Sequence, residues 1–170
     1  MKFPLTFQRE TNDCGPTCLK MIADYYGKDY ALDFLKKKCR VTEVGASMLN
    51  ISKTAEAIGF ESTGVKINIE QLKKIVQDIP VIFHINENHF VVIYKAPKPK
   101  KQGVFYLADP SQGLVTYKES EFIKYWIGSK KKKESGSGFL SNQLIYNSIG
   151  YCLLLEPTPA FFKPKNSKKK

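Results

Sequence analysis

The spacing of apolar residues changes near the middle of this 170-residue chain, and the change limits the folds that it can adopt. Before it, apolar residues recur at helical spacing, which predicts helices over residues 15–26, 31–38, 48–58 and 69–77. After it, short apolar runs separated by turn residues predict strands over 81–85, 89–94, 103–108, 114–117 and 149–155, with a helix over 119–127. Helices followed by an antiparallel sheet predict an α+β fold of two lobes.

Residues at the expected ends of these segments support the boundaries. Gly27 and Gly59 stand where glycine commonly ends a helix. Ser47 and Asn68 stand where a polar side chain commonly caps one. Glu87 and Asn88 separate two apolar runs, which predicts a hairpin turn between the first two strands.

Length and composition indicate one globular domain. Hydrophobic residues make up 42% and charged residues 25%, and no apolar run approaches the roughly 18 residues of a membrane helix. The N-terminus lacks a signal-peptide pattern, which favours reduced cysteines. No second Cys or His pair sits at zinc spacing, so we expect no metal site and interpret Cys18, Cys39 and Cys152 as structural.

The net charge of +11 is concentrated in a few lysine clusters, at 36–38, 98–101, 130–133 and 163–170. We interpret the clusters as solvated loops and a tail. Contact with an anionic lipid surface is the second interpretation. Nucleic-acid binding has the weaker case, because no recognised binding motif accompanies the charge.

Cys14 lies at the predicted start of the first helix, within Asp13-Cys14-Gly15-Pro16. Gly15 lets another backbone pass close to the thiol, and Pro16 fits the first helical turn. The free N–H groups of a helix N-terminus favour a thiolate, which is how a cysteine becomes a nucleophile. Taken alone, Cys14 would more often be a small buried residue, so its interpretation depends on the rest of the chain.

A cysteine nucleophile needs a base and an orienting group, and the chain has two histidines. His89 opens a predicted strand and Asp109 ends the next one, so antiparallel pairing would place them side by side. His89 would then take the proton of Cys14, and Asp109 would hold the imidazole. Gln8 is a candidate donor to the developing oxyanion, with the Cys14 backbone N–H as the second donor. His84, inside an apolar strand, is interpreted as structural.

Two further motifs accompany these residues: Pro110 follows Asp109, and the last predicted strand ends in Leu155-Glu156-Pro157. Together with Gln8 and the segments around Cys14 and His89, they resemble the bacteriocin-processing cysteine peptidase family, the N-terminal domains of bacterial peptidase-containing ABC transporters. The resemblance implies a papain-like fold, with the cysteine on the helical lobe and the histidine and aspartate on the sheet lobe. It implies catalytic roles for Cys14, His89, Asp109 and Gln8, and cleavage of a leader peptide after a Gly-Gly pair, coupled to export by the transporter.

The resemblance also implies partners and a location. The partners are a precursor peptide with a Gly-Gly leader and the transmembrane and nucleotide-binding parts of an ABC transporter, at the cytoplasmic face of the bacterial plasma membrane. The peptidase domain would need no cofactor, because ATP would bind only in a separate nucleotide-binding domain. We expect the peptidase domain over residues 1–157, with a flexible insertion at about 129–148, and a basic linker over 158–170 that suits the membrane surface.

Two other classes of function stay open on the sequence. The chain could be a non-catalytic module that docks the substrates of a peptide exporter, although degenerate members of such a family would be expected to lose Cys14. It could also be a basic protein that binds lipid or nucleic acid and carries an incidental thiol. Tyr25, Met48 and Ile51 are candidates for a leader-binding groove, but each is better interpreted as a core residue.

Overall fold

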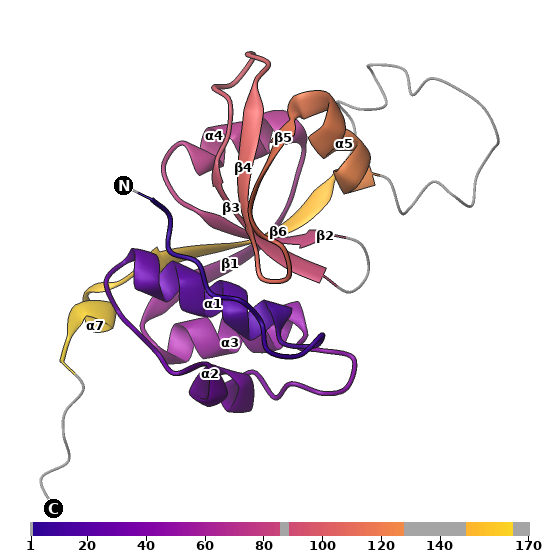
Figure 1. Cartoon of the computed structure of the whole chain (residues 1–170). Helices are drawn as coiled ribbons and strands as arrows, with labels where there is room; N and C mark the ends of the chain where they lie inside the picture. The colour runs from indigo at the N-terminus through magenta and orange to yellow at the C-terminus, as the bar shows by residue number, and fades with distance from the viewer. Residues whose placement is uncertain (1, 86–88, 128–148, 165–170) are drawn as a thin grey trace, which may run out of the picture.

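The computed structural model describes residues 2–85, 89–127 and 149–164 (Figure 1). Three helices form a lobe on one side of the sheet: α1 (Cys14–Tyr25), α2 (Leu32–Lys38) and α3 (Met48–Ala57). On the other side lie α4 (Ile69–Val76) and α5 (Glu119–Ile127). A short helix, α7 (Pro159–Phe162), follows the last strand. No helix of the described ranges is long and apolar enough to cross a membrane.

The sheet has six strands in the described part of the chain. They are β1 (Phe60–Ile67), β2 (Val81–Ile85), β3 (His89–Lys95), β4 (Val104–Asp109), β5 (Gly113–Lys118) and β6 (Gly150–Pro157). Their order is β1-β6-β2-β3-β4-β5, and every neighbouring pair is antiparallel. The predicted α+β fold of a helical lobe followed by an antiparallel sheet is therefore confirmed.

The pleat of the sheet divides its apolar residues between two cores. Ile82 pairs with Val92 and Leu153, and all three belong to the core shared with α1 and α3. Their neighbours Phe83 and Val91 belong to the core beneath α4 and α5. Because both faces are covered, the central strands are continuous apolar runs, and this made them recognisable in the sequence.

The strand that the sequence did not predict is β1. It is an edge strand, and Phe60 and Ile67 at its two ends are its only fully buried residues. It pairs with β6 along its whole length. β1 is a strand because it pairs with β6, which lies about 90 residues away along the chain. The residues between its two buried ends do not alternate between buried and exposed, so the local sequence carries no period-two signal.

The segment predicted as a linker begins with packed residues. The hydroxyl of Thr158 donates to the carbonyl of Gly59 at 2.6 Å, and Phe161 is fully buried, with its ring centroid 4.5 Å from that of Phe60. The ammonium of Lys28 donates to the carbonyl oxygens of Phe161 and Lys163. Packed structure thus continues past residue 157. The predicted insertion at 129–148, the hairpin turn at 87–88 and the end of the tail lie outside the described residues.

The predicted helix caps are present. The Ser47 hydroxyl accepts from the backbone N–H of Asn50 at 3.1 Å. Asn68 and Gln71 form a capping box, in which each side chain accepts from the backbone N–H of the other at 2.9 Å. Gly27 follows α1 with φ +88°, a backbone conformation that favours glycine.

A buried cation joins α4 and α5, the two helices on the face of the sheet opposite the helical lobe. Lys73 of α4 is almost fully buried, and its ammonium lies 2.9 Å from carboxylate oxygens of both Glu70 and Glu119. It also donates to the carbonyl of Lys101 at 2.8 Å. Burial lowers the pKa of Lys73, but the bonds to the two carboxylates raise it above its ordinary value. The charge is therefore kept and ties α4, the loop before β4 and the start of α5 together.

Gly59 offers a test of how tightly the C-terminal turn is packed. Its φ is +106°, and an added Cβ would lie 2.5 Å from the backbone of Phe161. We expect Gly59→Ala to lower the free energy of unfolding by about 2–4 kcal/mol in urea titrations. Gly27→Ala is the matched control, because Gly27 also has positive φ but open space around it. It should cost only about 1 kcal/mol, and equal losses would contradict the packing of α7 described above.

Candidate active site

Cys14 is the first residue of α1, as predicted, and it is buried. The preceding residue, Asp13, is also fully buried, and its carboxylate accepts from the Glu10 N–H at 3.1 Å and lies 2.9 Å from the ammonium of Lys36. The backbone carbonyl of Asp13 accepts from both the N–H and the hydroxyl of Thr17. These bonds fix the turn that presents the thiol, and the lysine on α2 balances the buried negative charge beside it.

Gly15 allows close helix packing in addition to the close approach of another backbone to the Cys14 thiol. A Cβ at this position would lie 2.7 Å from Cδ1 of Ile51 on α3. The absence of a side chain therefore lets the first turn of α1 approach α3 closely. Ile51 is fully buried, which confirms its interpretation as a core residue. Met48 is half-buried against the same core, whereas Tyr25 is 49% exposed.

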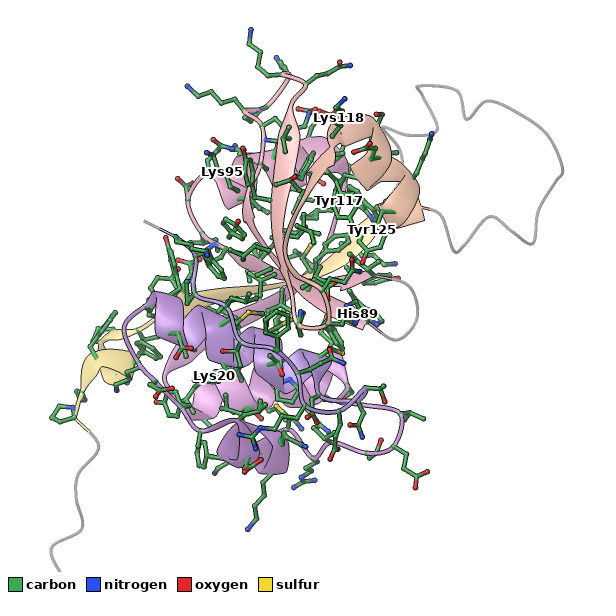
Figure 2. All side chains as sticks on the ribbon, in the orientation of Figure 1. Lys20, His89, Lys95, Tyr117, Lys118 and Tyr125 are labelled. Atoms are coloured by element: carbon green, nitrogen blue, oxygen red, sulfur yellow. The ribbon has the colours of Figure 1, made fainter. Side chains whose placement is uncertain are left out.

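His89 and Asp109 meet because of the antiparallel pairing of β3 with β4, as predicted. Val92 lies opposite Ala108 in the register, which brings the start of β3 beside the end of β4. The Nε2 atom of His89 lies 2.9 Å from Oδ1 of Asp109. Figure 2 shows His89 at the end of the sheet that faces the helical lobe.

The carboxylate of Asp109 is buried and held by the turn that follows it. The backbone N–H and the hydroxyl of Ser111 donate to Oδ1 at 2.8 Å and 2.7 Å, and the amide of Gln112 donates to Oδ2 at 3.4 Å. Burial raises the pKa of Asp109, but the bonds from His89 and Ser111 bring it below the ordinary value. Asp109 is therefore an anion at neutral pH and stabilises a positive charge on the imidazole.

The imidazole of His89 forms hydrogen bonds with both Asp109 and Cys14. Burial lowers its pKa, but hydrogen bonds to Asp109 and to Cys14 raise it, with the result that the pKa rises to about 9. Nε2 faces Asp109, so Nδ1 is the ring nitrogen left to form the hydrogen bond with Cys14. At neutral pH the imidazole is therefore protonated.

Gln8 is tied to the same end of the sheet by its backbone. Its N–H donates to the carbonyl of Pro110 at 2.9 Å, directly after Asp109. Its side-chain amide donates to the carbonyl of Glu10 at 3.0 Å. An amide nitrogen carries two hydrogens, so this bond orients the side chain and leaves a second donor.

The other candidate residues lie in structural surroundings. None of the four cysteines, all of which lie in the described part of the chain, forms a disulfide, and all four are buried. Burial raises the pKa of Cys18 well above its ordinary value, with further increases from Cys14 and Asp109, so this thiol stays protonated. His84 is half-buried, with its ring stacked on Phe90 at 4.5 Å. No group of three or more potential metal ligands occurs among the described residues.

Two residues near the site were not identified from the sequence. Ser111 stands two positions after Asp109, a spacing typical of an Asx turn, so a signal for it existed. Lys36 lies within a run of three lysines, and the sequence pattern predicts solvent exposure for all three. Its contact with Asp13 depends on how α2 packs against the start of α1, and no local pattern reports that packing.

A cysteine at a helix start, facing a His–Asp pair at the end of an antiparallel sheet, defines a papain-like cysteine peptidase. The sequence model of the Peptidase C39 family matches residues 2–130, and the chain belongs to this family. The resemblance noted in the sequence is thereby confirmed.

Relatives and solved structures agree with this assignment. The chain is 30% identical over 143 residues to the colicin V secretion/processing ATP-binding protein CvaB of Escherichia coli, covering 84% of this chain and 20% of the relative. It is 31% identical over 128 residues to the lactococcin-G-processing and transport ATP-binding protein LagD of Lactococcus lactis, covering 73% and 18%. The chain thus spans about a fifth of the length of these relatives.

Among solved structures, the fold matches a double-glycine motif protease from an AMS/PCAT transporter in complex with its leader peptide. The TM-score is 0.69 at 31% identity, covering 92% of this chain and 93% of the other. The peptidase domain of Streptococcus ComA matches with a TM-score of 0.70 at 22% identity, covering 92% and 100%. Both support the papain-like fold.

The charge on His89 can be tested by its titration. Because the folded pKa of about 9 lies above the ordinary value of 6.5, the protonated ring stabilises the fold fully below pH 6.5, and this stabilisation is lost as pH rises through about 9. NMR titration of the imidazole should give a midpoint near 9, and Asp109→Asn should lower it. The His84→Gln variant assigns the signals, and a midpoint unchanged by Asp109→Asn would contradict the pairing.

Proposed function

We propose that this chain is a cysteine endopeptidase that cleaves the leader peptides of bacteriocin-like precursors after a Gly-Gly pair, coupled to export by an ABC transporter. The observation that carries the proposal is the His89–Asp109 pair set against Cys14 at the start of α1. The substrate class is supported by the solved double-glycine motif protease with its leader peptide and by relatives named for secretion and processing.

In the proposed mechanism, the sulfur of Cys14 has given its proton to Nδ1 of His89 and attacks the carbonyl carbon of the scissile bond. The tetrahedral intermediate collapses when Nδ1 gives its proton to the leaving amine, which leaves an acyl group on Cys14. His89 then takes a proton from water, and the hydroxide attacks the thioester. The intermediate releases the thiolate and the carboxylic acid product, which loses its proton to solvent. Asp109 keeps Nε2 protonated and the ring oriented throughout.

Gln8 is proposed to stabilise the oxyanion of the tetrahedral intermediate. Its backbone bond to Pro110 and its side-chain bond to Glu10 hold the amide at the end of the sheet where His89 lies. The remaining N–H of the amide, with the backbone N–H of Cys14, would receive the negative charge. Because both donors are held before substrate arrives, little reorganisation is needed during the reaction.

The relatives also indicate the partners of the domain. We propose that the domain acts beside the transmembrane and nucleotide-binding parts of an ABC transporter, at the cytoplasmic face of the bacterial plasma membrane. The relatives that carry this domain are named as secretion and transport ATP-binding proteins, and this chain covers 20% and 18% of their lengths. Every proposed step uses side chains of this chain and water, so we propose that the peptidase reaction itself takes no cofactor.

Loss of the nucleophile gives the first test. The domain incubated with a synthetic Gly-Gly leader peptide should release the leader, and Cys14→Ala should reduce the rate to background, as measured by mass spectrometry. Cys39→Ala is the matched control, because it removes another buried thiol on the same lobe. Equal cleavage by wild type and Cys14→Ala would exclude the cysteine mechanism.

The oxyanion role of Gln8 gives the second test. Gln8→Ala should lower kcat by roughly a hundredfold or more with little change in KM, because the lost bond forms only as negative charge develops. Gln112→Ala removes another amide from the turn beside Asp109 and should affect kcat far less. An unchanged kcat in Gln8→Ala would remove Gln8 from the mechanism.

A further inference from the structure

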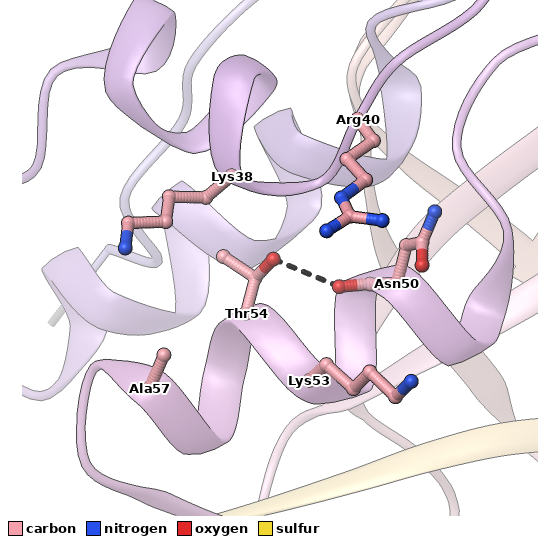
Figure 3. A pocket seen from close by; sticks show the side chains of 6 residues that line it. All are labelled: Lys38, Arg40, Asn50, Lys53, Thr54 and Ala57. Atoms are coloured by element: carbon pink, nitrogen blue, oxygen red, sulfur yellow. Dashed lines mark hydrogen bonds between the residues drawn. The ribbon is translucent and has the colours of Figure 1, made fainter.

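A basic hollow lies on the helical lobe, between the end of α2 and the outer side of α3 (Figure 3). Its volume is about 160 Å³, and its walls are Lys38, Arg40, Asn50, Lys53, Thr54 and Ala57. A second hollow of about 430 Å³ adjoins it, because both share Lys38 and Arg40. The second hollow is also lined by Phe34, whose side chain is 40% exposed.

The positive charges around the first hollow are not balanced by the protein. Among the described residues, no carboxylate lies within ion-pair distance of Lys38, Arg40 or Lys53, and none of the six wall residues is acidic. Lys36, in the same lysine run, differs because it pairs with Asp13 and Glu10. The ammonium groups of Lys38 and Lys53 point to opposite sides of the hollow (Figure 3), and that of Lys38 lies over the Phe34 ring, 5.8 Å from its centroid. Both long side chains can turn toward a bound anion, and a multiply charged anion would offset the repulsion among three cations that no described carboxylate pairs.

The backbone of Arg40 points to a role for its side chain. Its φ is +52°, and it occupies the position after α2 where helices usually place glycine. The bonds from Arg40 N–H to the Lys37 carbonyl and from Val41 N–H to the Lys36 carbonyl complete this helix ending. Glycine would adopt this conformation with less strain than arginine does, so the outlier makes a role for the guanidinium a hypothesis to test.

We propose that this hollow binds a phosphate group. The guanidinium of Arg40 can contact two phosphate oxygens at once, and Lys38 and Lys53 add compact positive charges. Asn50 adds an amide donor, and the Thr54 hydroxyl already donates to the Asn50 carbonyl, which fixes this turn of α3 (Figure 3). The volume suits a phosphate-sized group, and the adjoining hollow beside Phe34 has room for the organic part of a phosphate ester.

The phosphate could belong to a soluble molecule or to a phospholipid headgroup, and two binding arms distinguish these sources. The first titrates the domain with sodium phosphate by calorimetry at constant ionic strength. The second measures co-sedimentation with vesicles of phosphatidylcholine alone or mixed with phosphatidylglycerol. The variants are Arg40→Gly and Lys53→Gln. The matched control is Lys118→Gln, which removes an exposed lysine at the far end of the sheet lobe (Figure 2).

We expect saturable phosphate binding by wild type and Lys118→Gln, and affinity at least about tenfold weaker in Arg40→Gly and Lys53→Gln. The melting temperature of Arg40→Gly should equal or exceed that of wild type, which separates lost binding from lost folding. Arg40-dependent co-sedimentation with the anionic vesicles would assign the phosphate to lipid, and phosphate binding without co-sedimentation would assign it to a soluble molecule.

Two results would overturn the proposal. One is the absence of saturable binding in both arms. The other is equal affinity in Arg40→Gly and Lys118→Gln, which would reduce the binding to general attraction by net positive charge. Because none of the wall residues has a role in the proposed reaction, leader cleavage by Arg40→Gly should match wild type. The phosphate site and the peptidase activity can therefore fail independently.

Discussion

The pairing of β3 with β4 is the interaction on which the site depends. It places the first residue of one strand beside the last residue of the other, and so joins His89 to Asp109 without any contribution from a long loop. The same turn receives the backbone N–H of Gln8, which ties the segment before α1 to the sheet. A one-residue slip in this register would turn His89 to the opposite face and separate it from Cys14.

Buried charges are paired on both lobes beside the candidate active site. On the sheet lobe, Asp109 is held by Ser111 and faces His89, and it keeps the imidazole charged at neutral pH. On the helical lobe, Asp13 is buried directly before Cys14 and is balanced by Lys36 of α2. Loss of Lys36 would leave an uncompensated negative charge beside the thiol, so α2 has an electrostatic part in the site as well as a packing part.

The sequence predicted the elements that have buried faces and missed those defined by distant partners. The sequence predicted the positions of Cys14, His89 and Asp109, because each stands at the end of an element whose apolar residues have a clear period. β1 was missed because its buried residues are confined to its ends and β6 pairs it from far along the chain. The packed start of the tail was missed because one buried aromatic, Phe161, outweighs the surrounding prolines and lysines. The basic hollow depends on a backbone conformation at Arg40 that no local pattern predicts.

Cys14, activated by His89, is the nucleophile that we propose attacks after a Gly-Gly pair. The most direct measurement uses a leader peptide that ends in a Gly-Gly aldehyde, follows formation of its thiohemiacetal with a cysteine by NMR of the isotope-labelled aldehyde carbon, and locates the adduct in a crystal structure of the complex. We expect one adduct, on Cys14, whose formation is greatly slowed in His89→Ala and with an Ala-Ala aldehyde. An adduct on Cys18, Cys39 or Cys152, or equal rates for the two aldehydes, would contradict the proposal.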